Sequence, residues 1–337
     1  MHRLSLWKLL FLVALVTGTI IIIRQQRPAD YHTDSGMVFG TTYNITYQSA
    51  DDLKDDIERV LGDVDNSLSP FNENSVISRV NRNEEVTPDS MFVHVFNLAR
   101  RISADTDGCF DITVAPLVNA WGFGFADGDE PVDRVVDSLT AVVGYDKVSL
   151  TGEGADLRVT KSDSRVMIDC SAIAKGYGCD AVAAMLRSKG IGNFMVEIGG
   201  EVVTAGVNGK GTPWRIGIAK PVDDTLNVGR EIQTVIGVSD KAMATSGNYR
   251  NFYYKDGRKY AHTIDPHTGR PVQHSLLSAT VTAPDCATAD AYATAFMVMG
   301  VERARRLLQR HPEMGAYLIY EDADGAMQME TIAGREP

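Results

Sequence analysis

Cysteine is scarce in this chain of 337 residues, which contains only Cys109, Cys170, Cys179 and Cys286. No two of them form a C-x-x-C pair, so the sequence is neither a small disulfide scaffold nor a zinc ribbon. Basic residues are also few, because 33 Lys and Arg stand against 44 Asp and Glu and the formal net charge is −11. With no basic stripe to offset that charge, the sequence argues against binding to nucleic acid.

The most common nucleotide-binding and hydrolase motifs are absent as well. The sequence has no G-x-x-x-x-G-K-[ST] loop, no G-x-G-x-x-G after an expected strand, no H-E-x-x-H and no G-x-S-x-G. Nucleotide binding by the two most common routes is therefore unsupported.

A long uncharged apolar run is found at the N-terminus. Residues 9–23 carry no charge; Arg3 and Lys8 precede them, and Arg24 and Arg27 follow them. A charged segment before an apolar run is typical of an export signal. The run is a little shorter than the roughly 20 residues of a comfortable membrane span. A cleaved signal peptide and an uncleaved anchor both fit, and we favour the anchor because no cleavage site is obvious.

This interpretation divides the chain into three segments. Residues 1–27 are expected to be the signal or membrane anchor, 28–36 a linker, and 37–335 one domain. That domain would lie on the periplasmic, or extracytoplasmic, side of the cell inner membrane, held by a single N-terminal helix. No cysteine follows the apolar run, so a lipid-anchored lipoprotein is excluded.

The body of the chain combines strands and helices without strict alternation. Segments 251–255 and 258–262 flank Asp256-Gly257, which is a strong hairpin signal. Segments 172–189 and 285–299 have helical character. Strands that come mostly as hairpins indicate the α+β class, with largely antiparallel sheets flanked by helices.

Asp290 and Thr294 are the first candidate site. Residues four apart share one face of a helix, so the two side chains present oxygen atoms to one point. Hard cations such as Mg²⁺ prefer oxygen ligands. An exposed aspartate on a surface helix is the alternative, but the surrounding alanines and Phe296 indicate a buried helix, where a carboxylate needs a partner.

Asp169 to Gly178 form a second candidate site, in which a strand is expected to end and a helix to begin. Asp169 or Ser171 would cap that helix in the simplest interpretation. In the functional one, the helix N-terminus faces a phosphate or another ligand, with Lys175 one turn inside. Backbone carbonyls before the first turn could also ligate a metal.

Two weaker candidates remain. His262 ends an expected hairpin strand, and a histidine titrates near working pH, which suits a general base. A hydrogen-bonded structural histidine fits equally well, and the spacing to the nearby histidines matches no common zinc site. Trp121, next to Gly122, would form one wall of a ligand site, where the glycine lets the backbone approach closely. Core packing is the usual explanation for such a tryptophan.

In their order and combination, these motifs resemble the ApbE family, the FAD:protein FMN transferases formerly called thiamine biosynthesis lipoproteins. The resemblance covers about 39–335. It is carried by Gly40-Thr41-Thr42, Phe71-Asn72, Ser75 to Arg79, Phe110 to Thr113, Pro116 to Gly124, Asp169 to Gly178, Ile198 to Glu201, Pro213 to Ile218, Ala244 to Gly247, His262 to Pro271 and Ala289 to Thr294.

The resemblance implies two α+β lobes with FAD bound in the cleft between them. It also implies a Mg²⁺-dependent reaction that cleaves the FAD pyrophosphate, releases AMP and leaves FMN on a threonine or serine of a target protein. Such targets include subunits of membrane redox complexes. Two alternatives stay open: a FAD pyrophosphatase that uses water as acceptor and gives FMN and AMP, and a non-catalytic FAD-binding protein.

The same resemblance assigns roles to individual residues. His262 matches the proposed catalytic histidine, with Asp290 in reserve as a base. The metal site resembles the Ala172 backbone carbonyl together with the Asp290 and Thr294 side chains. Phe39 stands where the family usually has Met, and Phe71 where it commonly has Tyr. The positions that would contact FAD are Phe39, Phe71, Ala120, Trp121, Gly122, Asp169, Lys175 and Ile264.

Overall fold

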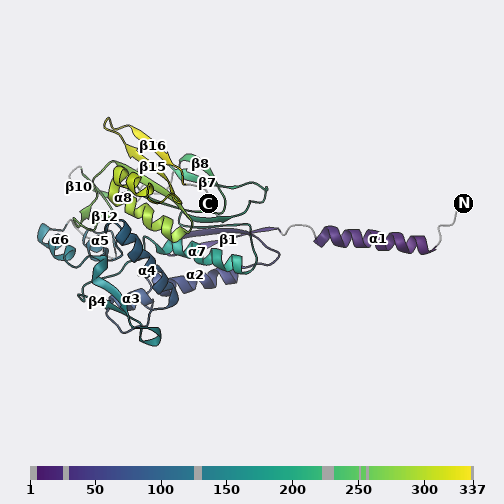
Figure 1. The fold of residues 1–337 in the computed structure, drawn as a ribbon, viewed down its shortest axis with the longest axis horizontal. Helices are drawn as coiled ribbons and strands as arrows, with labels where there is room; N and C mark the ends of the chain where they lie inside the picture. Colours follow the sequence, from purple (N-terminus) through teal and green to yellow (C-terminus); the bar gives the residue numbers. More distant parts are fainter. Residues whose placement is uncertain are drawn as a thin grey trace.

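The structure is a computed structural model that describes residues 6–25, 30–124, 131–221, 231–249, 252–255 and 258–334 (Figure 1). Eight α-helices lie in these ranges, with two short 3₁₀ turns at Tyr145–Lys147 and Gly154–Asp156. The helices are α1 (Leu6–Gln25), α2 (Lys54–Leu68), α3 (Val76–Asn81), α4 (Ser90–Asp105), α5 (Ala115–Ala120), α6 (Asp133–Thr140), α7 (Ala174–Ser188) and α8 (Cys286–Leu308).

The strands of the described ranges form one large sheet and four short two-stranded ribbons. The large sheet has the order β1-β2-β5-β6-β9-β14-β15-β16, and every neighbouring pair in it is antiparallel. The predicted α+β class with a largely antiparallel sheet is thereby confirmed. The strands are β1 (Tyr31–Val38), β2 (Thr41–Gln48), β3 (Val148–Thr151), β4 (Arg158–Lys161), β5 (Phe194–Ile198), β6 (Glu201–Ala205), β7 (Trp214–Ala219), β8 (Ile232–Val238), β9 (Ala242–Gly247), β10 (Phe252–Lys255), β11 (Arg258–Ala261), β12 (Ile264–Asp265), β13 (Arg270–Pro271), β14 (Leu276–Ala283), β15 (Gly315–Glu321) and β16 (Met327–Ile332).

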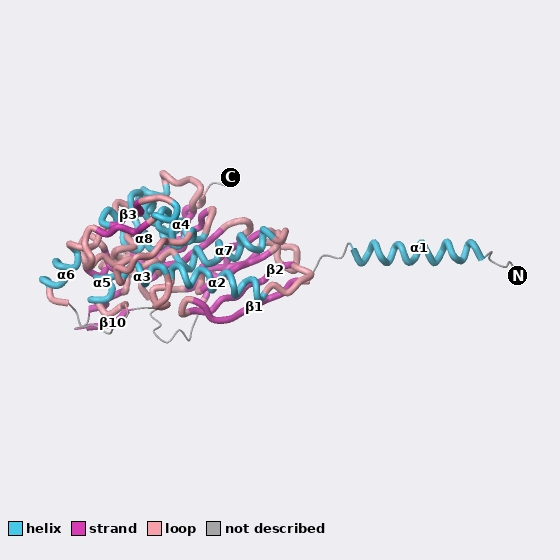
Figure 2. The backbone as a smooth tube through the Cα atoms, turned by 90° about the horizontal axis from the view of Figure 1, so that it is seen from below, coloured by secondary structure: helices cyan, strands magenta, loops and turns pink. Residues whose placement is uncertain are grey.

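Strand β6 shows how the sheet is covered on both faces. All five of its residues are buried, unlike the alternating pattern of its neighbour β5. Val203 packs in the apolar cluster that α2 and α7 share with the sheet, whereas Val202 packs with residues of β7 and β8. Helices, among them α2 and α7 in Figure 2, therefore cover one face, and the β7–β8 ribbon covers part of the other.

The contact between α7 and α8 brings the two most important candidate segments together. Gly176 of α7 lies so close to α8 that a Cβ atom there would come within 2.3 Å of the Cys286 carbonyl oxygen. Asp180 accepts hydrogen bonds from the Cys286 and Ala287 amides, both at 2.8 Å, and so satisfies the first turn of α8. The first turn of α7 is thereby fixed beside the first turns of α8.

A second, smaller part of the molecule has its own apolar cluster. It combines α5 and α6 with residues of β11 and β12, and its buried members include Leu117, Val136 and Tyr260. The stacked rings of Tyr253 and Tyr260 join β10 to β11, with centroids 5.3 Å apart. Residues Asp256 and Gly257 of the expected hairpin turn lie outside the described residues.

The N-terminal segments differ in part from the predicted division. Tyr31–Val38 pair with β2, so residues 31–36 of the predicted linker 28–36 belong to the large sheet. The polar composition of this segment suggested a linker, but backbone pairing with a neighbouring strand does not require apolar side chains. Residues Leu6–Gln25 form α1. Within the described ranges, no helix is both long and apolar enough to cross a membrane.

Candidate active site

A cavity of about 500 Å³ lies between the α7–α8 region and the smaller part of the molecule. That volume is in the usual range for a site that binds a small molecule or cofactor. It is lined by α8, the end of β9, the first turn of α7, and the loops around residues 69–71, 109–112 and 262–266. Nine predicted site residues line it: Phe39, Phe71, Asp169, Ala172, Lys175, His262, Ile264, Asp290 and Thr294.

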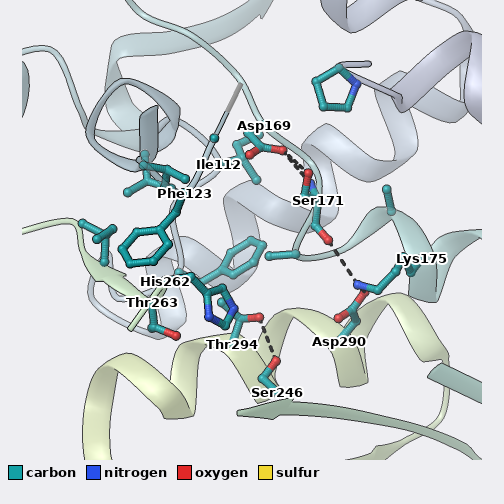
Figure 3. Close-up of a pocket in the computed structure, with 18 of the residues that line it drawn as sticks. Ile112, Phe123, Asp169, Ser171, Lys175, Ser246, His262, Thr263, Asp290 and Thr294 are labelled. Carbon is teal, nitrogen blue, oxygen red and sulfur yellow. Dashed lines mark hydrogen bonds and ion pairs between the residues drawn. The ribbon is translucent and has the colours of Figure 1, made fainter. Parts of the chain in front are cut away.

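Helix α8 presents Asp290 and Thr294 to the cavity from successive turns of one face. Asp285 starts the helix by accepting a hydrogen bond from the Thr288 amide at 2.8 Å. Asp290 is only 2% exposed, and one of its oxygens accepts from the Gly176 amide at 3.1 Å. The Thr294 hydroxyl lies 3.1 Å from the Ser246 hydroxyl of β9. The spacing predicted from the sequence therefore places two oxygen donors at one cavity wall (Figure 3).

Lys175 lies between two buried carboxylates. Its ammonium nitrogen is 3.8 Å from Asp290 and 3.7 Å from Glu201, and it also donates to the Ser171 carbonyl at 3.3 Å. Burial lowers the pKa of Lys175, but the two carboxylates outweigh this effect and raise it above its ordinary value. Lys175 is therefore a fixed positive charge in the cavity, suited to an anionic ligand such as a phosphate.

The segment before α7 is a tight turn rather than a helix cap. Asp169 accepts hydrogen bonds from the Ser171 amide at 2.8 Å and the Ser171 hydroxyl at 2.6 Å. Helix α7 begins only at Ala174, and neither residue caps it. The turn leaves Asp169, Ser171 and Ala172 on the cavity lining, within the segment that was predicted to face a ligand.

The donor set suits a hard cation, although it is not a cluster of charged ligands. Among the described residues, no group of three or more His, Cys, Asp or Glu side chains could hold a metal ion. Protein sites for Mg²⁺ commonly use one or two carboxylates and take further oxygens from water and substrate phosphates. Asp290 and Thr294 supply such oxygens, and Ala172 lines the same cavity, so these residues fit the ion.

His262 lines the same cavity from the loop between β11 and β12, and Figure 3 shows its ring beside Thr294. Thr263, the next residue, is buried and donates to the Asn248 side chain at 2.6 Å, and its carbonyl accepts from the Val272 amide at 3.0 Å. The Phe123 ring lies edge-on to the imidazole, with centroids 6.5 Å apart. These contacts fix the backbone that carries His262 and hold the ring at the cavity.

Phe39 and Phe71 contribute aromatic surface to the cavity. Phe39 has a φ angle of 50°, a conformation that is uncommon for residues other than glycine. A Cβ atom on Gly178 would come within 2.8 Å of the Phe39 ring, so the ring depends on that glycine for space. Phe71 is 71% exposed, which leaves much of its ring accessible to a planar ligand.

Ala120, Trp121 and Gly122, which were predicted to contact FAD, do not line the cavity. Trp121 is buried in the smaller apolar cluster, and its indole nitrogen donates to the Gly269 carbonyl at 2.7 Å. The cavity is instead lined by Asn119, Phe123 and Gly124 of the same segment. The core-packing interpretation thus describes Trp121 in this structure, and its neighbours supply the wall.

Glu201 and Ser246 were missed by the sequence analysis. Glu201 begins β6, is 3% exposed, and shares Lys175 with Asp290. Ser246 meets Thr294 across the gap between β9 and α8. Their partners lie far away in the chain, so local spacing could not reveal them. The only available sequence signal was that both residues fall in segments that resemble the ApbE family.

We expect Lys175→Met to destabilise the protein in a pH-dependent way. Burial raises the pKa of Asp290, and the Lys175 ammonium opposes that rise. Without the ammonium, the folded-state pKa moves further above the unfolded value. The loss in free energy of unfolding, relative to the wild type, should then be small near pH 4 and grow as the pH rises, reaching about 2 kcal/mol at pH 8.

Urea unfolding at pH 5 and pH 8 measures this effect. Lys189→Met is a matched control, because it removes a 2.6 Å surface ion pair with Asp56 and should change stability little at either pH. An equal loss at both pH values in Lys175→Met would show that Asp290 and Glu201 do not depend on this ammonium.

The fold and cavity define an α+β protein with a ligand site that combines buried carboxylates, a fixed lysine and a histidine. Comparison with known proteins identifies the family. The ApbE family matches residues 39–318, and the chain belongs to that family.

Several members of the family are similar over nearly their whole length. The FAD:protein FMN transferase of Vibrio cholerae serotype O1 is 37% identical, with 94% of this chain and 95% of the relative covered. The Escherichia coli K12 protein of the same name is 32% identical, with 93% of each covered. The solved structure of the flavin transferase ApbE from Vibrio cholerae is similar with a TM-score of 0.80 and 38% identity, covering 91% of this chain and 98% of the other. That of Pseudomonas stutzeri flavinyl transferase ApbE, apo form, has a TM-score of 0.80 and 29% identity, covering 92% and 96%.

Proposed function

We propose that this protein is a FAD:protein FMN transferase, which moves FMN from FAD to a threonine or serine hydroxyl of a target flavoprotein. The observation that carries the proposal is that Asp290, Thr294, Lys175 and His262 all line one cavity, with Lys175 3.8 Å from Asp290. The names of its relatives support the same activity. The enzyme is thus a transferase whose substrates are FAD and a second protein.

The reaction exchanges the phosphoanhydride bond of FAD for a phosphoester bond to the acceptor. The acceptor oxygen attacks the phosphorus of the FMN half, the P–O bond of the pyrophosphate breaks, and AMP leaves with the bridging oxygen. The hydroxyl proton passes to a base. Because phosphoryl transfer depends mainly on positioning and charge stabilisation, fixed charged groups around the phosphates matter most.

Each residue of the site has a role in this scheme. Lys175 binds phosphate oxygens, and its position is set by Asp290 and Glu201. Asp290, Thr294 and the Ala172 carbonyl would hold Mg²⁺, which when bound neutralises charge on the reacting phosphate. His262 takes the hydroxyl proton, a role typically worth about 10²–10⁴ in rate. Phe39, Phe71 and Ile264 provide apolar surface for the flavin or adenine rings.

The experiment is intact-mass analysis of a candidate acceptor domain after incubation with the protein, FAD and Mg²⁺. We expect the acceptor to gain the mass of one FMN unit, and only when Mg²⁺ is present. Free FMN and AMP without an adduct would instead identify a FAD pyrophosphatase. Unchanged FAD with every acceptor tried would contradict an enzymatic role.

We also propose that the catalytic domain lies outside the cytoplasm, tethered to the inner membrane, where subunits of membrane redox complexes would be its targets. The support is the charged N-terminal segment before the uncharged residues 9–23. We expect the full chain to fractionate with membranes and to be digested by protease added to spheroplasts. Protection from the protease until the cells are lysed would contradict this location.

A further inference from the structure

Strand β1 forms one edge of the large sheet. It pairs with β2, and no other described strand pairs with it. None of its eight residues is buried, and its side chains are exposed or half-buried throughout. An edge strand of this kind presents backbone groups that can pair with another chain, unless charge, proline or a covering segment blocks it.

The direction of the β1 backbone groups follows from the bonds that β2 makes on its other side. The Thr42 carbonyl accepts from the Gly199 amide at 2.9 Å, and the Gln48 amide donates to the Asn193 carbonyl at 2.9 Å. The backbone amide and carbonyl groups of even-numbered residues of β2 therefore point toward β5, and those of odd-numbered residues point toward β1.

The same alternation continues into β1. The odd-numbered residues of β2 are opposite His32, Asp34, Gly36 and Val38. The alternate residues of β1 then point their amide and carbonyl groups away from the sheet. These outward residues are Tyr31, Thr33, Ser35 and Met37.

This edge leads directly to the reaction cavity. β1 ends at the two-residue turn Phe39-Gly40, and Phe39 lines the cavity. Met37, the last outward residue, has a side chain that is 71% exposed, and Phe71 at the cavity lining is equally exposed. An extended segment paired with β1 would therefore have one end close to the cavity, near the exposed Met37, which lies two residues before Phe39.

The opposite edge of the sheet lacks this connection. β16 pairs with β15, and no residue of β16 lines the cavity. Glu330 of β16 forms a 2.6 Å ion pair with Arg305 of α8, so this strand is tied to the helix behind it. Of the two edges, only that of β1 can guide a bound strand into the site.

We propose that an extended segment of the acceptor protein pairs with the outer edge of β1 and delivers its threonine or serine hydroxyl to the cavity. The inference rests on the proposed function, which requires a second protein to place a hydroxyl beside the FMN phosphate. Main-chain pairing gives affinity without demanding one sequence, while side-chain contacts near Met37 and Phe71 select the segment.

The test is Ser35→Pro in the full chain. Proline removes one outward amide and places its ring along the edge, and it is tolerated on edge strands where that amide does not bond inward. The Michaelis constant for the acceptor domain should rise about fivefold or more, with kcat at saturating acceptor and FAD binding unchanged. Ser35→Ala is the matched control, since it keeps the amide and should behave as the wild type.

Hydrogen exchange supplies a second measurement that needs no variant. A peptide spanning the flavinylated residue of that acceptor should slow exchange of the Thr33, Ser35 and Met37 amides. Normal acceptor kinetics in a folded Ser35→Pro variant, or unprotected β1 amides, would overturn the inference while the transferase activity stands. Absence of any FMN adduct with the wild-type chain would instead contradict the proposed function. A concentration-dependent dimer lost in Ser35→Pro would identify a second copy of this chain as the occupant and overturn it as well.

Discussion

Asp290→Asn should reduce FMN transfer by about 10³-fold or more and abolish its dependence on Mg²⁺. The substitution keeps the shape of the side chain and an oxygen that can accept from the Gly176 amide. It removes the charge that faces Lys175 and that would hold the cation. Because phosphoryl transfer relies on electrostatic stabilisation at fixed positions, loss of this charge should affect the chemical step more than the fold.

Rates with and without Mg²⁺, together with Mg²⁺ affinity from calorimetry, measure this effect. Asp105→Asn is a matched control. Asp105 accepts a hydrogen bond at 2.8 Å from Tyr292 of α8, the helix that carries Asp290, but Asp105 does not line the cavity. It should keep normal turnover. Wild-type activity in a folded Asp290→Asn variant would contradict the assignment of Asp290 as a Mg²⁺ ligand.

His262→Ala should lower the rate of transfer by about 10²–10⁴ while FAD still binds. The imidazole lines the same cavity as Asp290, in a loop fixed by the Thr263 contacts, so its removal should leave that loop in place. Pre-steady-state transfer rates and FAD fluorescence titration separate the two effects.

The neighbouring histidine provides the control for this experiment. His267 lies five residues further on, is half exposed, and does not line the cavity, so His267→Ala should be active. If His262→Ala changed only the affinity for FAD, with the transfer rate intact, His262 would be a binding residue and another base would be required.

The sequence was most informative where function depends on spacing within one element. Asp290 and Thr294 are four residues apart, and the alanine-rich segment around them predicted a buried helix, so the structure confirms that they share one face. Lys175 was likewise expected one turn inside a helix beginning at 172, and it lies in the first turn of α7, which begins at Ala174. Local periodicity fixes such relations before any tertiary contact is known.

The sequence was least informative where a residue depends on a distant partner. Glu201 becomes part of the site only because β6 begins beside α7, and its sequence neighbours give no sign of this. Trp121 donates to the Gly269 carbonyl across 148 positions of the chain, which turns it into the core.

The most direct test of the proposed activity is the stoichiometry of transfer. An acceptor domain, FAD and Mg²⁺ are incubated with the wild-type chain, and the reaction is followed by intact mass for the acceptor and by chromatography for AMP. The account predicts one AMP released for each acceptor that gains FMN, with the added mass on a single threonine or serine. Release of AMP together with free FMN, and no change in the acceptor, would contradict it.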